Sequence, residues 1–188
     1  MREVVLDIET IPCKLSLWKK LDAELKKKFF RDTDSEEEAR KATALDPALG
    51  RIVCIGLLLV GNGRPQPKLL AEEDEAAILR DFWKAIVPED YVIGHNVLSF
   101  DLPFIRVRSV ICEVKPTCGF DLRRYTSQTI YDTQEVWCNW DWQRRPKLAL
   151  LAHAFGLPGK LGSGRQVEDW YRKKGWRQIK RYCEQDVR

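Results

Sequence analysis

The sequence predicts an α/β fold in which a mixed central β-sheet is flanked by helices. The run RIVCIGLLLV at 51–60 is the strongest strand signal in the chain. Over 72–87, apolar residues recur at the spacing that gives a helix one buried face. Further along, short strand signals alternate with helix signals, a pattern that indicates parallel strand pairs with helices packed on the sheet faces.

Composition and length limit the kind of protein. The 188 residues are 44% hydrophobic and 32% charged, which is ordinary for a globular protein, and we expect residues 1–188 to form a single domain. No apolar run approaches the length that crosses a bilayer, and a strand-like segment begins close to Met1. We therefore expect a cytoplasmic protein that has no leader peptide and no membrane partner.

The six cysteines show no C-x-x-C pair, and several lie in apolar segments. We expect reduced thiols rather than disulfides or a zinc site. Charge is distributed unevenly, because residues 1–100 carry a net −3 and residues 101–188 a net +7. A basic second half would attract a polyanion, although charged runs alone are more often a solvated face.

The first element is a short β-branched strand at 3–7, which we expect to end where Asp7 and Glu9 begin. Side chains two residues apart in an extended chain point to the same side. The two carboxylates are therefore placed to share one ligand.

A helical insertion of about 14–46 follows. Residues 14–31 carry leucine, tryptophan and phenylalanine at helical spacing with lysines between them, which predicts one amphipathic helix. Ser35 and Glu38 have the spacing of a capping box for a second helix, which we expect to end before Asp46.

The remaining elements alternate between strand and helix. In order, we expect strands at 51–60 and 67–71 joined by a turn at 61–63, a helix at 72–87, a strand at 91–94, a helix at 102–112, a strand at 129–133, and helices at 148–155, 167–174 and 176–187. The strand at 67–71 returns antiparallel. Asp101 then sits at a strand-to-helix junction.

Acidic residues in three distant segments are the main functional signal: Asp7 and Glu9, Asp101, and Asp186. Four hard oxygen donors in one pocket are tolerable mainly around divalent cations, which indicates a metal-dependent phosphodiesterase. Tyr182 is four residues before Asp186, so both lie on one helix face. Taken alone, that last pair is more often a packed ring and an ordinary exposed charge.

Together these segments resemble the DEDD superfamily of 3′→5′ exonucleases, in its tyrosine-bearing branch, on the ribonuclease H-like fold. The motifs are Asp7-Ile8-Glu9-Thr10, Asn96 with Phe100-Asp101, and Tyr182-x-x-x-Asp186. The segments GHNVLSFDLPFI, KLALLAHAFGLPGK and YCEQDV are most similar to the predicted bacterial and phage exonucleases related to the proofreading domain of family-B DNA polymerases. The histidine-bearing branch would place a histidine where this chain has Arg181.

The resemblance implies catalysis by two divalent cations, Mg²⁺ or Mn²⁺. It implies that Asp7 bridges both ions, that Glu9 and Asp186 hold the water-activating ion, and that Asp101 supports the second ion through water. Tyr182 would orient the attacking water, since a phenol with a pKa near 10 is a poor base at neutral pH.

The resemblance also implies four substrate-binding residues, Thr10, Ile11, Asn96 and Phe100. For Ile11 and Phe100, core packing is an equal alternative. The expected substrate is single-stranded nucleic acid, with DNA favoured over RNA, in association with a DNA polymerase or a repair complex. The alternative function is a catalytically weak nucleic-acid-binding or polymerase-associated module of the same fold.

Two further features bear on the substrate. The segment VWCNWDWQRR interleaves aromatic and basic residues as single-strand binding surfaces do, yet we expect at least two of Trp137, Trp140 and Trp142 to fill the core. Lys160 and Arg165 lie in a glycine-rich loop that either follows the phosphate backbone or is simply a surface loop.

His153, on an apolar helix, is expected to be buried. Relatives of the resembled family usually continue past the third motif, whereas this sequence stops two residues after Asp186. A truncated end and a natural end both remain open.

Overall fold

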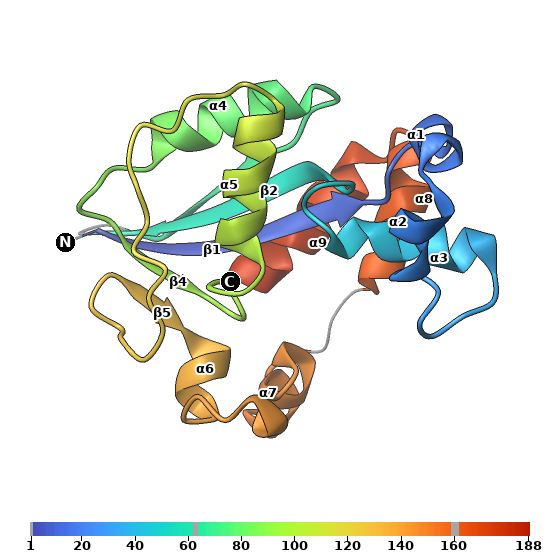
Figure 1. The fold of residues 1–188 in the computed structure, drawn as a ribbon. Helices are drawn as coiled ribbons and strands as arrows, with labels where there is room; N and C mark the ends of the chain where they lie inside the picture. Colours follow the sequence, from blue (N-terminus) through green and yellow to red (C-terminus); the bar gives the residue numbers. More distant parts are fainter. Residues whose placement is uncertain (1, 62–63, 159–161) are drawn as a thin grey trace.

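A mixed five-stranded sheet is the centre of the part of the chain that the computed structural model describes, residues 2–61, 64–158 and 162–188 (Figure 1). Its strands are β1 Glu3–Ile11, β2 Arg51–Val60, β3 Gln66–Leu70, β4 Tyr91–Gly94 and β5 Ile130–Asp132. The spatial order is β3-β2-β1-β4-β5. The β3-β2-β1 pairings are antiparallel and the β1-β4-β5 pairings are parallel. The predicted α/β fold with a mixed sheet is confirmed.

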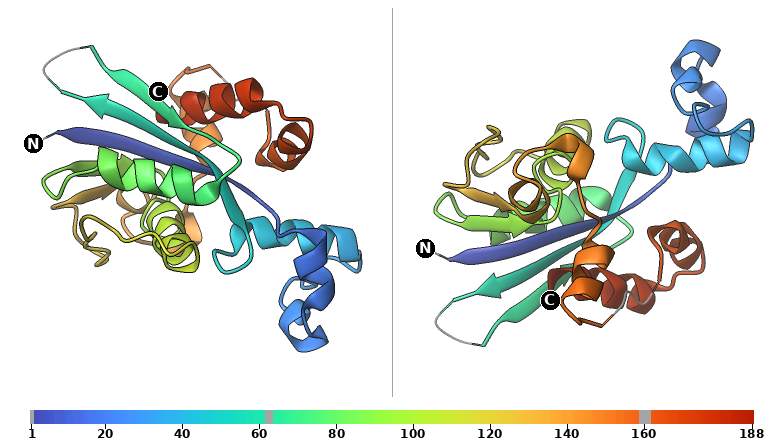
Figure 2. Two further views of the ribbon diagram at one scale, coloured as in Figure 1. Left: turned by 90° about the horizontal axis from the view of Figure 1, so that it is seen from above. Right: turned by 90° about the horizontal axis from the view of Figure 1, so that it is seen from below.

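Helices surround this sheet, and four of them cover its two faces. They are α1 Leu15–Lys20, α2 Ala23–Lys27, α3 Glu36–Ala42, α4 Glu75–Ala85, α5 Asp101–Ile111, α6 Thr133–Trp137, α7 Leu148–Ala154, α8 Val167–Arg172 and α9 Trp176–Val187, with 3₁₀ turns at Thr43–Leu45, Trp142–Arg144 and Gly164–Gln166. α4 and α5 lie over one face, and α8 and α9 over the other (Figure 2). α6 and α7 lie next to each other beyond β5 (Figure 1).

Alternation along β1 divides the core into two clusters, because successive side chains of a strand point to opposite faces. Val4, Leu6 and Ile8 pack with the buried side chains of α4 and α5. The second cluster, under α8 and α9, contains Ile11, Val53, Cys54, Val167, Ile179, Tyr182 and Cys183. Asp7 and Glu9 alternate with the first set and therefore point toward α9.

β1 is longer than predicted. The expected strand ends where the carboxylates begin, but β1 continues to Ile11 and includes both Asp7 and Glu9. This expectation is wrong because β2 supplies backbone partners along the whole length, with Asp7 opposite Gly56 and Glu9 opposite Cys54. Burial of the strand on both faces outweighs the polarity of two side chains.

The helical insertion after the first strand is present, but its first helix is broken. The single helix expected over 14–31 is wrong: α1 and α2 are separate helices. In one continuous helix, Trp18 and Phe29 would be about 16 Å apart along the axis. The break instead brings their rings edge to face, with centroids 6.0 Å apart, and so gives the insertion its own small core. Half of the predicted capping box is present: Ser35 caps α3 by accepting a hydrogen bond from Glu38 N at 3.4 Å, whereas Ser35 N donates to Thr33 Oγ1 rather than to the Glu38 side chain.

The other predicted strands and helices are confirmed, with small shifts at their ends. α6 was not predicted, because five residues are too few to show a helical period. Part of the turn expected at 61–63 lies outside the described residues. All six cysteines are free thiols, as expected. Among the described residues, no helix has the length and apolar character that crossing a membrane requires.

Candidate active site

The candidate site lies where β1 and β4 separate. Their pairing ends at Val5 opposite Ile93, after which the chain leaves the sheet through residues 95–100 to reach α5. Beyond that point, none of the described residues pairs with β1 as a strand on this side, and the Ile8 N–H donates instead to Asp101 Oδ1 at 3.0 Å. The buried Asp101 carboxylate thus replaces a missing strand and is fixed beside β1.

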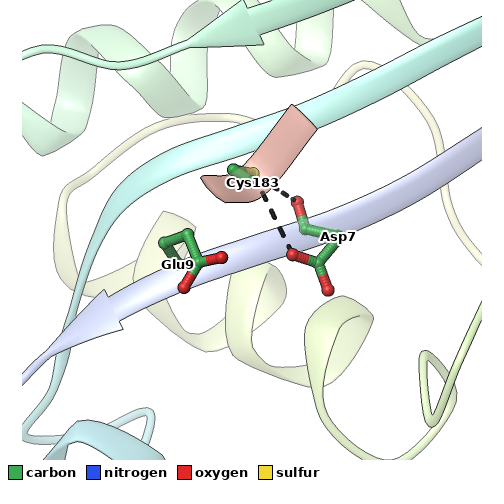
Figure 3. A group of neighbouring side chains, drawn as sticks. All are labelled: Asp7, Glu9 and Cys183. Atoms are coloured by element: carbon green, nitrogen blue, oxygen red, sulfur yellow. Dashed lines mark hydrogen bonds between the residues drawn. The ribbon is translucent and has the colours of Figure 1, made fainter. Parts of the chain in front are cut away.

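Asp7 and Glu9 lie next to each other on β1 (Figure 3). One oxygen of each and the Cys183 sulfur all lie within 4.8 Å of one another. Glu9 is buried and Asp7 is half-buried. Cys183 comes from α9, and its sulfur is 3.8 Å from the main-chain oxygen of Asp7 and 3.9 Å from Asp7 Oδ2. α9 therefore rests directly on the carboxylate pair.

α9 carries the last two predicted residues, Tyr182 and Asp186, which share one helix face. The negative charge of Asp186 raises the pKa of Asp101 across the site. It also raises the pKa of Tyr182, as do Glu9 and Asp7. The structure thus brings all five predicted residues into one site, with Asp7, Glu9 and Asp186 near Tyr182 and with Asp186 also near Asp101.

The two neighbours of the carboxylates on α9, the Tyr182 phenol and the Cys183 thiol, both keep their protons. Burial first, and then the surrounding negative charges, raise the pKa of Tyr182 above its usual value, so its phenol keeps its proton and is a hydrogen-bond donor. The hydrogen bond with Cys54, burial and nearby carboxylates raise the pKa of the Cys183 thiol well above its usual range. A neutral thiol is a poor ligand for hard cations.

The pKa of the Asp101 carboxyl group is raised. Burial raises the pKa of Asp101 to about 7; hydrogen bonds from backbone N–H groups, including that of Ile8, oppose this shift, and the charges of Asp132 and Asp186 add to it. When the pKa of a carboxyl group is higher in the folded than in the unfolded chain, the group makes its full contribution to stability at pH values below the unfolded pKa. That contribution is lost as the pH rises through the folded value, here near 7.

The metal-free protein should therefore lose stability between about pH 5 and pH 8, with Asp101 contributing on the order of a few kcal/mol. Thermal melts in chelator across this range measure the effect. Asp101→Asn keeps an oxygen for the Ile8 N–H but cannot ionise, so its profile should be flatter. Wild-type and variant profiles of the same slope would contradict the assignment.

Asp132 is a site residue that sequence reasoning missed. This buried carboxylate ends β5 and accepts hydrogen bonds from Asn96 N at 2.9 Å and Leu98 N at 3.0 Å. It also caps α6 through two further backbone N–H groups. Asp132 thus fixes the loop that leads to Asp101. The sequence feature that could have identified Asp132 is its position at the end of a strand and at the N-cap of a helix.

Gly56 is a second missed residue, and it explains how α9 reaches the strand. A Cβ at Gly56 would lie 2.8 Å from Cys183 Sγ and 3.2 Å from Val187 Cγ1. Any side chain here would therefore push α9 away from β2. Because α9 carries Tyr182 and Asp186, this glycine controls the geometry of the acidic site.

Gly56→Ala should lower stability by about 1–3 kcal/mol through overpacking and should lower nuclease activity by displacing α9. Truncating the clashing side chain in Gly56→Ala/Cys183→Ala should recover part of both losses, and a double-mutant cycle measures this coupling. Gly119→Ala, where a Cβ meets nothing within 4 Å, is the matched control. Independent, additive effects of the two substitutions would refute the close-approach explanation.

Thr10 and Ile11 are the last two residues of β1, and the structure gives each of them a contact within the protein. Thr10 Oγ1 donates to Ala44 O at 2.8 Å, which ties β1 to the end of the insertion. Ile11 is buried in the cluster under α8 and α9. For Ile11, core packing is the arrangement that the structure contains.

Asn96 and Phe100 belong to the loop between β4 and α5. Asn96 has a φ of 66°, and its backbone N–H is the one held by Asp132. Phe100 is half-buried, with its ring centroid 5.4 Å from that of Phe104. Both residues adjoin Asp101, and their side chains remain candidates for substrate contact.

Two expectations about surrounding residues are wrong. His153 is exposed, because α7 is covered mainly at Leu151. Of the three tryptophans, only Trp140 packs against the main core, whereas Trp137 and Trp142 are exposed. Arg165 lies on an exposed 3₁₀ turn. The expectation for Lys160 falls outside the described residues.

Comparison with protein families decides the relationship that the motifs predicted. Residues 45–188 match the model of a family described as predicted 3′–5′ exonucleases related to the exonuclease domain of PolB. The chain belongs to this exonuclease family. The predicted relation to the 3′→5′ exonucleases that resemble the proofreading domain of family-B DNA polymerases is thus confirmed. A search of curated proteins found no match.

One solved structure supports the fold, and a second is similar over part of the chain. The zinc-bound complex of E. coli ExoI with single-stranded DNA aligns with a TM-score of 0.51 at 14% identity, over 96% of this chain and 42% of that chain. E. coli Exonuclease I in complex with a dA13 oligonucleotide aligns with a TM-score of 0.42 at 15% identity, over 72% of this chain and 29% of that chain. The family member described here thus spans less than half the length of these enzymes.

Proposed function

We propose that this exonuclease removes nucleoside 5′-monophosphates from the 3′ end of single-stranded DNA with two divalent cations. The observation that carries the proposal is the convergence of carboxylates from β1, α5 and α9, seen in the effect of Asp186 on the pKa of Asp101. Carboxylates gathered in a partly buried site are costly unless cations balance their charge. We further propose that residues 1–188 act as one domain.

The donor set fits Mg²⁺ or Mn²⁺, since both prefer carboxylate oxygens and the nearby thiol is neutral. Asp7 would bridge the two ions, with Glu9 and Asp186 completing the first site. One oxygen of Asp101 is already held by the Ile8 N–H, so a role through water suits it. When bound, the ions supply water activation and stabilise the leaving 3′ oxygen.

Tyr182 would position the attacking water. Its raised pKa keeps the phenol protonated, so the hydroxyl donates or accepts a hydrogen bond without removing a proton as a base. Its ring is held edge to face by Trp170 of α8 at 5.6 Å. This packing fixes the direction of the hydroxyl, which is the requirement for orienting a water.

Single-stranded DNA is the favoured substrate over RNA. The basic second half of the chain suits a polyanion, and the ExoI structure of similar fold was solved with single-stranded DNA. Thr10, Ile11, Asn96 and Phe100 adjoin the carboxylates in sequence and are proposed to bound the terminal nucleotide. The family's relation to PolB supports association with a DNA polymerase or a repair complex.

The test is a 5′-labelled single-stranded DNA incubated with Mg²⁺ or Mn²⁺. We expect a ladder that shortens from the 3′ end, is abolished by chelator and returns when the metal is restored. A labelled RNA of the same sequence measures the preference between the two. Binding without shortening would contradict the proposal and favour the catalytically weak nucleic-acid-binding module.

A further inference from the structure

An exposed apolar surface on α6, α7 and the segment between them has no role in the carboxylate site. Trp137 is 57% exposed, Trp142 72% and Phe155 61%, and Leu150 and Leu157 of the same part of the chain are exposed as well. We refer to these five residues as the aromatic surface. Exposed apolar side chains that gather on one surface mark interaction sites more often than single exposed side chains do.

Two rings of the aromatic surface, those of Trp137 and Phe155, pack against each other. Trp137 and Phe155 meet edge to face with centroids 5.5 Å apart and an interplanar angle of 87°. They come from α6 and from the residue that follows α7, so the contact joins the two helices. An edge-to-face pair that is more than half exposed leaves ring surface available for a third flat group.

The aromatic surface is connected to the carboxylate site. His95, in the loop that leads to Asp101, lies with Nε2 3.0 Å from Pro146 O, just before α7. Gln134 of α6 donates to the same oxygen at 3.0 Å. Since Gln134 is one helical turn before Trp137, a short chain of contacts links the rings to the active-site loop.

Charge around the aromatic surface favours an anionic occupant. The acidic residues within 133–158 are Glu135 and Asp141, and each is paired, with Arg145 and Arg144 respectively. Lys147 at the start of α7 is exposed and makes no ion pair with the described residues. The region therefore carries excess positive charge next to the rings.

We propose that the aromatic surface binds the single-stranded nucleic acid upstream of the 3′ end, with bases stacked on Trp137 and Phe155 and a phosphate at Lys147. This rests on the proposed function. Stacking on aromatic rings beside cations is how single strands are held without sequence preference. Nucleic acid fits better than an apolar protein partner, because Lys147 lies in the same segment as the rings and both acidic residues of that segment are paired with arginine.

Trp137→Ala and Phe155→Ala test the proposal. Binding of a fluorescein-labelled dT20 oligonucleotide is followed by anisotropy in chelator, so that no cleavage occurs. Each substitution should raise Kd roughly fivefold or more, as expected for losing one stacked base. Leu25→Ala is the matched control, because Leu25 is 58% exposed on α2, in the helical insertion and outside the aromatic surface, and it should leave Kd unchanged.

Lys147→Ala should lower the slope of log K against log salt by about 0.7, the value for one phosphate contact on a single strand. Circular dichroism melts of all variants establish that they are folded. Unchanged Kd values in folded Trp137→Ala and Phe155→Ala overturn the proposal.

Kinetics distinguish failure of this inference from failure of the proposed function. On dT20 with Mg²⁺, the two variants should raise KM without changing kcat, and on the dinucleotide pdTdT they should match wild type. If wild-type protein shortens dT20 and the variants do so with the same KM, only this inference fails. If wild-type protein does not shorten dT20, the proposed function itself fails.

Discussion

Asp7→Asn is expected to reduce nuclease activity by about a thousandfold or more while leaving the fold intact. A bridging carboxylate stabilises the charge of two ions, so losing it removes several kcal/mol of transition-state stabilisation. In chelator, the same substitution relieves repulsion with Glu9, whose carboxylate oxygen lies within 4.8 Å of that of Asp7, so the melting temperature should stay constant or rise. Nucleotide release from labelled dT20 and thermal melts measure both effects.

Tyr182→Phe is the comparison within the same site. It removes one hydrogen bond to the attacking water and keeps the ring packing against Trp170, so activity should fall only about ten- to a hundredfold. Near-normal nucleotide release by folded Asp7→Asn would disprove the metal-bridging role. A loss in Tyr182→Phe as large as that in Asp7→Asn would instead make the phenol the central group.

Asp132→Ala is expected to cause the largest loss of stability. The carboxylate satisfies the backbone N–H groups of Asn96 and Leu98 in a buried setting. Each unsatisfied buried donor costs about 1–3 kcal/mol, and the α6 cap is lost as well, so the total should be several kcal/mol. The released loop carries Asp101, so the Mg²⁺ concentration for half-maximal activity should also rise.

Asp141→Ala is the matched control for Asp132→Ala. Asp141 also caps a short helical turn, accepting from Gln143 N at 3.0 Å, but it makes no hydrogen bond to the active-site loop in the part of the chain that the structure describes. It should cost at most about 1 kcal/mol and leave the Mg²⁺ requirement unchanged. Equal effects of the two substitutions would show that Asp132 acts only as a helix cap.

The sequence predicts the sheet and the carboxylates better than it predicts how they are held. The strand at 51–60 and the pairing of Asp7 with Glu9 follow from local patterns, because period and spacing are properties of neighbouring residues. The convergence of Asp101 and Asp186 required the family resemblance, since they are 85 residues apart in the sequence. Spacing alone does not reveal which distant segments meet.

The supporting contacts depend on tertiary packing and were therefore not predicted. Gly56 is an ordinary strand glycine in the sequence, and only the approach of Cys183 gives it a function. Asp132 resembles many strand-end aspartates until Asn96 and Leu98 are brought to it. The exposure of Trp137 and Trp142 likewise could not be inferred, because the pattern of aromatic and basic residues is equally compatible with a core.

The most direct test of the central claim is a crystal of the protein soaked in Mn²⁺, with anomalous difference maps calculated around β1 and α9. Two peaks about 4 Å apart, bounded by Asp7, Glu9, Asp101 and Asp186, are the predicted result. A map with no peak among these four side chains, or with the Asp186 carboxylate directed away from the other three, would contradict the account.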